Sequence, residues 1–332
     1  MSLRPKFHEL ANYQGATFNK LARFDQVMFQ NDANFRNTNF LEFAKFESTS
    51  FRKTADFTRA IFQSIAIFKS STFDELATFY HCKFQWHVNF REVTFGENVD
   101  LRGAANQEDI KRITGTVRFD DVTFSKTVDF TNREFLNTTS FNDTLFHTHA
   151  PVFANTRLHE GTTWHGVQWP GTPDDPIAAR DMADAYSHLR RRSNAIQDHE
   201  AELDFYGREL RAKRAAVGGA TGFLISLYEW SCGFGASVGL PLVWLFGLWA
   251  SGPPFCRALL RLEGAAEIDG LTLYGFSLAS VGGFFGMRKE FFAEFMKDLP
   301  GTVLALSGAQ SLLGAVFVFL LGLSLRNRFR IK

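Results

Sequence analysis

The chain has 332 residues, and its 36 Lys and Arg against 35 Asp and Glu leave a net charge of +1. This near-neutral balance gives no electrostatic basis for binding nucleic acid. The three cysteines are too far apart in the sequence to indicate a zinc motif or a disulfide framework. The most unusual feature is the count of 38 Phe against 6 Tyr and 6 Trp, which indicates a repeat.

The first 20 residues carry charges and lack an apolar run, so we expect no signal peptide and a cytoplasmic N-terminal domain. From Phe18 to Phe95, and again from Phe119 to Phe146, Phe recurs at alternating separations of five and six residues. The residue two positions before each of these Phe is small or β-branched, and only Arg133 breaks the rule. Residues two apart on an extended chain face the same side, so each unit directs one small residue and one ring inward.

No single unit can bury its ring alone, so the chain is predicted to coil into a solenoid. An 11-residue period also fits a helical supercoil, but abundant Thr, Asn, Asp and Ser disfavour helix. Units such as "ADFTRAIF" and "ANFRNTNF" resemble the Phe-centred variant of the pentapeptide-repeat family over residues 16–169. The resemblance implies a right-handed quadrilateral β-helix of about six coils with stacked Phe rings inside. We expect the extra residue of each six-residue unit to form a bulge at a corner.

Residues 102–116 (RGAANQEDIKRITGT) interrupt the repeat with a polar, Gly-containing segment. Two interpretations stand: a loop that binds a partner, or a tolerated insertion. Four histidines without supporting carboxylates are expected on the surface or in turns rather than at a metal: His147, His149, His159 and His165. Trp164 and Trp169 keep the five-residue spacing and are predicted to cap the open end of the solenoid.

A proline-rich break, residues 169–176 (WPGTPDDP), separates the solenoid from a segment with helical periodicity. Asp198 is the predicted N-cap of a second helix in this segment. Alternating acidic and basic residues between 200 and 213 predict a salt-bridged, exposed helix face. The domains expected are a β-helix over 1–170, a helical linker over 171–216 and a transmembrane domain over 217–332.

The stretches 230–256 and 299–325 each contain 27 residues without a charge, and about 20 apolar residues span a bilayer. They predict transmembrane helices at about 234–256 and 301–325. Basic clusters precede the first span and follow the second, which places both termini in the cytoplasm by the positive-inside rule. The predicted location is the bacterial inner membrane, with four basic residues as headgroup anchors: Arg326, Arg328, Arg330 and Lys332.

Between the spans, residues 271–287 (LTLYGFSLASVGGFFGM) are uncharged, rich in Gly and Ser, and too short to cross and return as helix. They predict a re-entrant segment, followed by an amphipathic helix over 288–300. The order of span, re-entrant segment and span resembles two-transmembrane pore-loop channels, although the TVGYG filter of potassium channels is absent. The resulting filter candidates are Ser277, Ser280, Val281, Gly282, Gly283, Phe284 and Phe285.

The whole layout also resembles a group of bacterial pentapeptide-repeat membrane proteins through residues 200–214 (EAELDFYGRELRAKR) and 325–332 (LRNRFRIK). No nucleophile–base pair, phosphate loop or metal motif is present, so neither an enzyme nor a cofactor is expected. The first functional hypothesis is an oligomeric ion pore, four subunits by analogy, with the β-helix as sensor or gate. The second is a membrane-anchored scaffold whose β-helix binds a cytoplasmic protein. A third, a DNA mimic, requires an acidic surface, but charges balance over residues 16–101.

Overall fold

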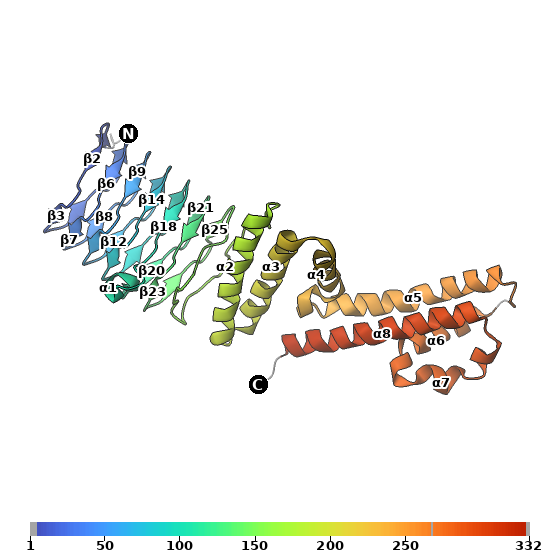
Figure 1. Cartoon of the computed structure of the whole chain (residues 1–332). Helices are drawn as coiled ribbons and strands as arrows, with labels where there is room; N and C mark the ends of the chain where they lie inside the picture. Colours follow the sequence, from blue (N-terminus) through green and yellow to red (C-terminus); the bar gives the residue numbers. More distant parts are fainter. Residues whose placement is uncertain (1–4, 267, 330–332) are drawn as a thin grey trace. The chain divides into compact units, whose positions relative to one another are not determined.

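A computed structural model describes residues 5–266 and 268–329 of the chain (Figure 1). The chain divides between Arg192 and Ser193 into two compact units, which are described separately. The first unit contains a β-solenoid of about six turns over residues 6–146, as predicted. The second unit is helical.

The solenoid is built from strands of two residues, paired in parallel with the strand one coil away. The first face contains β1 (Lys6–Phe7), β5 (Met28–Phe29), β9 (Ser50–Phe51), β13 (Thr72–Phe73), β17 (Thr94–Phe95), β21 (Thr123–Phe124) and β25 (Leu145–Phe146). The second face contains β2 (Ala11–Asn12), β6 (Ala33–Asn34), β10 (Ala55–Asp56), β14 (Ala77–Thr78), β18 (Val99–Asp100) and β22 (Val128–Asp129).

The third face is interrupted, and the fourth is continuous. The third contains β3 (Thr17–Phe18), β7 (Asn39–Phe40), β11 (Ile61–Phe62) and β15 (Lys83–Phe84), then, after helix α1 (Glu108–Lys111), β19 (Arg112–Ile113) and β23 (Glu134–Phe135). The fourth contains β4 (Ala22–Arg23), β8 (Ala44–Lys45), β12 (Ala66–Ile67), β16 (Val88–Asn89), β20 (Val117–Arg118) and β24 (Thr139–Ser140).

The register explains the spacing of the Phe residues. Strand partners lie 22 residues apart, as in Thr72 with Thr94, so four units make one coil. Across the interruption Thr94 pairs with Thr123, 29 residues on, so the insertion adds 29 − 22 = 7 residues to one coil. The rings form interior columns: Phe68 is fully buried and stacks at 5.0 Å on Phe46 and on Phe90. The predicted burial and coil-to-coil stacking of the rings is therefore confirmed.

Two kinds of corner account for the alternation of five and six. In the five-residue units the second residue after Phe has a left-handed backbone, as at Gln26 (φ 59°) and Arg59 (φ 58°). The N–H of the next residue then bonds to the Phe carbonyl, as from Ala60 to Phe57 at 2.9 Å, which is the geometry of a tight turn with positive φ at its third position. Each five-residue unit between Phe24 and Phe95 thus contains one residue with a left-handed backbone, and the six-residue units between them turn the corner without one.

The inward small residues also satisfy backbone carbonyls. Thr49 Oγ1 donates to Phe24 O at 2.6 Å, and Thr144 Oγ1 donates to Phe119 O at 2.6 Å, in each case 25 residues back along the chain. Cys82 Sγ makes the same contact with Phe57 O at 2.7 Å. The interior position two before Phe is therefore a slot for a small residue, and where that residue is Thr, Ser or Cys its side chain can replace water for a buried carbonyl.

Aromatic stacking continues to the C-terminal end of the solenoid. Trp164 stacks on Phe141 at 4.4 Å, and Trp169 stacks on Phe146 at 5.3 Å. Helix α2 (Pro176–Ala195) follows, and its Tyr186 meets Trp169 edge-on at 5.8 Å. The two Trp thus extend the ring columns as predicted, and α2 supplies the further cover that an open solenoid end requires.

The second unit contains α3 (His199–Val217), α4 (Gly219–Cys232), η1 (Gly233–Gly235), α5 (Gly239–Leu262), α6 (Gly270–Val281), η2 (Gly283–Phe285), α7 (Met287–Phe292), η3 (Phe295–Asp298) and α8 (Gly301–Arg328). Asp198 caps α3 as predicted, because its carboxylate accepts the Ala201 N–H at 3.1 Å. Helix α8 is long and apolar enough to cross a membrane, and α4 with α5 would form a second such stretch if read through a 114° bend.

The core of the second unit lies between α5, α6 and α8, where Cys256, Leu273, Phe276 and Val303 are buried together. The segment 288–300, expected as one amphipathic helix, is instead divided between α7 and η3. Both pieces turn an aromatic ring onto Phe276, because Phe292 and Phe295 meet that ring edge-on at 5.6 and 5.3 Å. Both pieces therefore pack against α6, and the two residues between them, Ala293 and Glu294, keep right-handed helical dihedrals.

Candidate functional site

The predicted filter hydroxyls lie on α6 and are used inside the same chain. Ser277 is fully buried, donates to Trp249 O of α5 at 2.8 Å and accepts from Gln310 Nε2 of α8 at 3.2 Å. Ser280 is also fully buried and donates to Phe276 O at 2.8 Å. Its own carbonyl accepts from Ser311 Oγ of α8 at 2.7 Å. These groups link three helices of one chain.

The predicted filter glycines mark close approaches between the same helices. A Cβ at Gly283 would lie 2.4 Å from Ser311 Oγ, and a Cβ at Gly314 on α8 would lie 2.3 Å from Val281 O. Gly282 caps α6, and a Cβ there would meet Met287 Sδ at 2.8 Å. Small residues that admit a neighbouring backbone in this way are characteristic of helix packing in membranes.

Of the remaining predicted residues, Phe285, Arg326 and Arg328 lie at the ends of helices. Phe285 is 67% exposed, and the side chain of Phe284 lies outside the described residues. Arg326 and Arg328 are exposed in the last turn of α8. Arg330 and Lys332 lie outside the described residues. The structure therefore brings together Ser277, Ser280, Val281 and Gly283, whereas Phe285, Arg326 and Arg328 are exposed.

A second candidate site lies on the third face of the solenoid, beside the insertion. A groove of about 630 Å³ is lined on the solenoid side by Arg59, Ile61, His81 and Lys83. The other side is formed by residues 107–110, which include the start of α1. The volume is within the range of small-ligand or peptide-side-chain pockets. Sequence reasoning identified the interruption but not the groove that it encloses.

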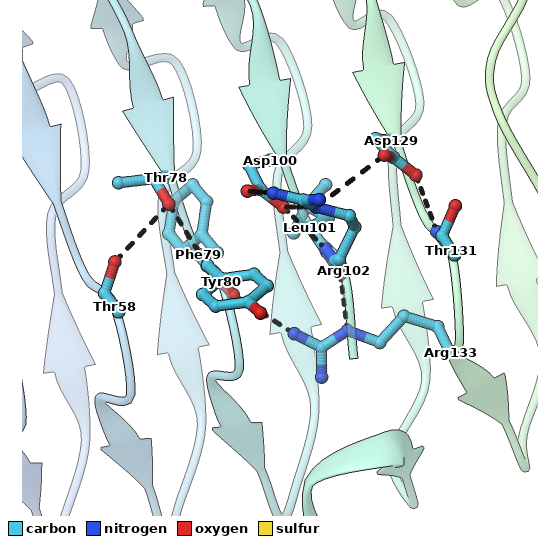
Figure 2. A network of polar contacts seen from close by, with 10 residues as sticks. All are labelled: Thr58, Thr78, Phe79, Tyr80, Asp100, Leu101, Arg102, Asp129, Thr131 and Arg133. Carbon is cyan, nitrogen blue, oxygen red and sulfur yellow. Dashed lines mark hydrogen bonds and ion pairs between the residues drawn. The ribbon is translucent and has the colours of Figure 1, made fainter. Parts of the chain in front are cut away.

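Arg133 holds the insertion against the solenoid. Its side chain is fully buried, and Figure 2 shows the guanidinium directed along the interior past Leu101 toward Phe79. Nε donates to Leu101 O at 2.5 Å, and Nη2 donates to Phe79 O at 3.1 Å. Nη1 donates to Cys82 O and to Ile110 O, both at 2.7 Å. One side chain thus satisfies four carbonyls, one of which belongs to α1.

The insertion explains why Arg133 occupies an interior position that is otherwise held by small residues. Phe79 O already accepts the Cys82 N–H at 3.0 Å, and Arg133 Nη2 adds a second hydrogen bond to it. Leu101 O has Arg133 Nε as its donor among the described residues. In regular coils the N–H after the slot donates one coil back, as from Lys83 to Ala60 O at 2.9 Å. The insertion displaces the corresponding donor for Cys82 O, and Arg133 replaces it. Unsatisfied buried carbonyls are costly, so these contacts stabilise the altered coil.

Burial changes the acid–base properties of this region. It lowers the pKa of the Arg133 guanidinium to about 10, because no described carboxylate pairs with that cation. Burial and the nearby Arg133 and Arg59 charges lower the pKa of His81, so this ring is neutral at pH 7. Burial raises the pKa of the Cys82 thiol to about 12. The interior beside the groove therefore carries an uncompensated positive charge.

On the second face, next to this interior, Arg102 forms a surface polar network (Figure 2). It donates to the Asp100 carboxylate through Nε at 3.0 Å and Nη2 at 2.7 Å, and it lies 3.7 Å from Asp129. The hydrogen bonds with Asp100 raise the pKa of Arg102. Its guanidinium also lies over the Tyr80 ring, 4.9 Å from the centroid. This arginine is therefore engaged by its own face of the solenoid.

The histidines near the end of the solenoid gather no ligand set. Within residues 5–266 and 268–329, no three His, Cys, Asp or Glu side chains are placed to hold a metal ion. His147, His149 and His165 are exposed, and the half-buried His159 ring accepts the Gly161 N–H at 3.0 Å. The four histidines therefore lie on the surface or in turns, as expected from the sequence.

Comparison of the chain with curated proteins and with solved structures finds no match. The solenoid does match a family model, over residues 46–94 and 57–105. These stretches include β11 and β15, which carry Ile61 and Lys83 of the groove. The model is described as "Pentapeptide repeats (9 copies)". The N-terminal region of the chain therefore carries pentapeptide repeats, and these form the β-solenoid described above.

Proposed function

We propose that the chain is a membrane-anchored β-solenoid that binds a protein partner, and that residues 270–286 pack helices rather than line a pore. The observation that carries this proposal is the engagement of Ser277 and Ser280 by α5 and α8 of the same chain. Hydroxyls that already satisfy buried carbonyls are not free to replace an ion's hydration shell. The proposal assigns the chain no catalytic activity and no cofactor.

The membrane anchor is supported by the exposure of the helical unit. Only 22% of the most apolar window of α8 is buried within the chain, whereas the central helix of a water-soluble core is buried on most sides. Large apolar side chains are also exposed on α4, α5 and α8: Phe223, Leu224, Val243, Phe246, Leu312 and Phe319. Lipid is the environment that accepts such a surface.

The proposed location is the bacterial inner membrane, with two crossings and both termini in the cytoplasm. The Lys and Arg residues just before residue 217 and after residue 325 support this orientation. Arg326 and Arg328 would then lie among lipid headgroups. In this arrangement the solenoid faces the cytoplasm, where a soluble partner can reach its walls.

An oligomeric ion pore is the second candidate, and one observation favours it. Helix α6 has 12 residues and is apolar, so at 1.5 Å per residue it reaches about 18 Å and cannot cross a core of about 30 Å. A short apolar helix between two longer ones is the layout of a pore loop. A pore would require several copies of the chain, four by analogy, and ions as the transported species.

Replacement of Gly283 by Leu separates the two candidates. The close Ser311 contact predicts that Gly283→Leu forces η2 away from α8 and lowers the melting temperature of the full chain in detergent. Gly308→Leu is the matched control on α8, because a Cβ there meets nothing within 4 Å. A pore predicts instead that Gly283→Leu leaves stability unchanged and abolishes a current that the wild-type chain carries in planar bilayers. That pair of results would refute the packing role.

A further inference from the structure

The groove beside the insertion has a basic wall with an unused cation. Arg59 is exposed at a left-handed corner, and among residues 5–266 and 268–329 it takes part in no ion pair. Lys83 and Asp109 neutralise each other across the groove at 3.2 Å. Glu108 is turned toward Arg112, at 2.8 Å. After these pairs are formed, the groove retains the charge of Arg59 at its surface.

A second positive charge lies beneath the groove. Arg133 donates to the carbonyl of Ile110, which lines the insertion wall, and to that of Cys82, which lies between the lining residues His81 and Lys83. It is paired with carbonyls alone among the described residues. A buried charge in a low-dielectric interior acts over a longer range than an exposed one. The groove is therefore electrostatically suited to an anion.

The groove also has an apolar component. Ile61 forms part of the solenoid wall, and Ile110 forms part of the insertion wall. Where this face turns into the fourth face, the exposed side chains include Leu21, Phe43 and Trp86. Apolar side chains in the lining of a charged groove are typical of a protein-binding surface rather than of a site for a small inorganic anion.

We propose that the groove binds an acidic segment of a partner protein, in which an Asp or Glu side chain pairs with Arg59 and an adjacent apolar side chain packs on Ile61 and Ile110. The inference rests on the proposed function and specifies the partner's chemistry. Asp109 occupies part of this site in the free protein. Its carboxylate is 83% exposed and pairs with Lys83, so it competes with an incoming carboxylate for that cation.

The competition gives the proposal a distinctive test. Binding of a fluorescein-labelled, end-capped Leu-Glu-Leu-Glu-Leu-Glu peptide to the full chain in non-ionic detergent is measured by fluorescence polarisation. Arg59→Gln is expected to weaken binding about five-fold, and Asp109→Asn to strengthen it about three-fold by releasing Lys83. Arg52→Gln and Asp74→Asn are matched controls, because these residues pair with each other at 2.7 Å on the first face and should leave affinity unchanged.

Three outcomes would overturn the proposal. Equal effects of Arg59→Gln and Arg52→Gln would show non-specific attraction to the solenoid. Stronger binding of the matched Leu-Lys peptide would show that the groove prefers cations. An absence of binding by both peptides would show that it is not an acidic-segment site. None of these outcomes bears on the Gly283→Leu experiment, so failure of the groove can be told apart from failure of the scaffold.

Discussion

Replacement of Phe68 by Ala tests whether the ring columns stabilise the solenoid. The ring is fully buried, stacks on Phe46 and Phe90 at 5.0 Å, and meets Phe79 edge-on at 5.3 Å. Removal of a buried Phe costs about 3–5 kcal/mol, of which each aromatic pair supplies about 0.5–1.5 kcal/mol. We expect the upper part of this range, because hydrogen-bonded coils on both sides prevent the cavity from collapsing.

Phe7→Ala is the matched control, because Phe7 lies at the end of a column, is 37% exposed and stacks only on Phe29 at 5.1 Å among the described rings. We expect it to cost about 1–2 kcal/mol, because the ring is only partly buried and loses one stack. Urea unfolding of the full chain, followed by circular dichroism, gives the global effect, and hydrogen exchange locates it in the solenoid. If the two substitutions cost the same, stacking within the columns is not the source of stability.

Three other predictions concern acidity, the thiol and topology. Glu134→Gln should lower stability by about 1 kcal/mol at pH 7, since hydrogen bonds from Lys111 at 2.8 Å and Arg112 at 3.1 Å lower the pKa of Glu134. Because the pKa of Glu134 is lower in the folded than in the unfolded chain, its carboxylate stabilises the fold at pH values above the unfolded-state pKa. The difference in melting temperature between the wild type and Glu134→Gln should therefore shrink as the pH falls through the folded-state pKa. A difference that does not change with pH would contradict this. The buried Cys82 should resist thiol reagents in the folded chain, and rapid labelling would contradict its burial. Cys82→Ser should change the melting temperature by only a few degrees, because a hydroxyl makes the same hydrogen bond at Thr49. A reporter fused after the last residue should be cytoplasmic and one placed between α5 and α6 external, and the reverse pair would overturn the orientation.

The solenoid was predictable because its repeat is written directly in the sequence. A buried Phe on each of the four faces of a square coil must recur at the corner spacing, so the period identifies both the ring columns and the inward small residues. Arg133 was visible as an exception to the rule, but its role was not. Its four acceptors belong to residues 79, 82, 101 and 110, which come together only when coils stack.

The helical unit was less predictable for a different reason. Apolar composition indicates membrane helices, but it does not state which face of α6 meets a neighbour. Ser277 and Ser280 have the same sequence context whether they face an axis between subunits or Gln310 and Ser311 of their own chain. The contacts of Phe292 and Phe295 with the ring of Phe276 likewise have no local signal in the sequence.

The contacts of Arg133 have a consequence for how such a solenoid could change over generations. With the seven extra residues but a small side chain at 133, the carbonyls of Leu101, Cys82 and Ile110 would lose their donor. With Arg133 but a regular coil, a guanidinium would be sealed in the interior with its acceptors already bonded to the ladder. Each single step is therefore unfavourable, and the two together are not. The arginine and the insertion form one inherited pair, so the loop cannot be transplanted to another coil without its arginine.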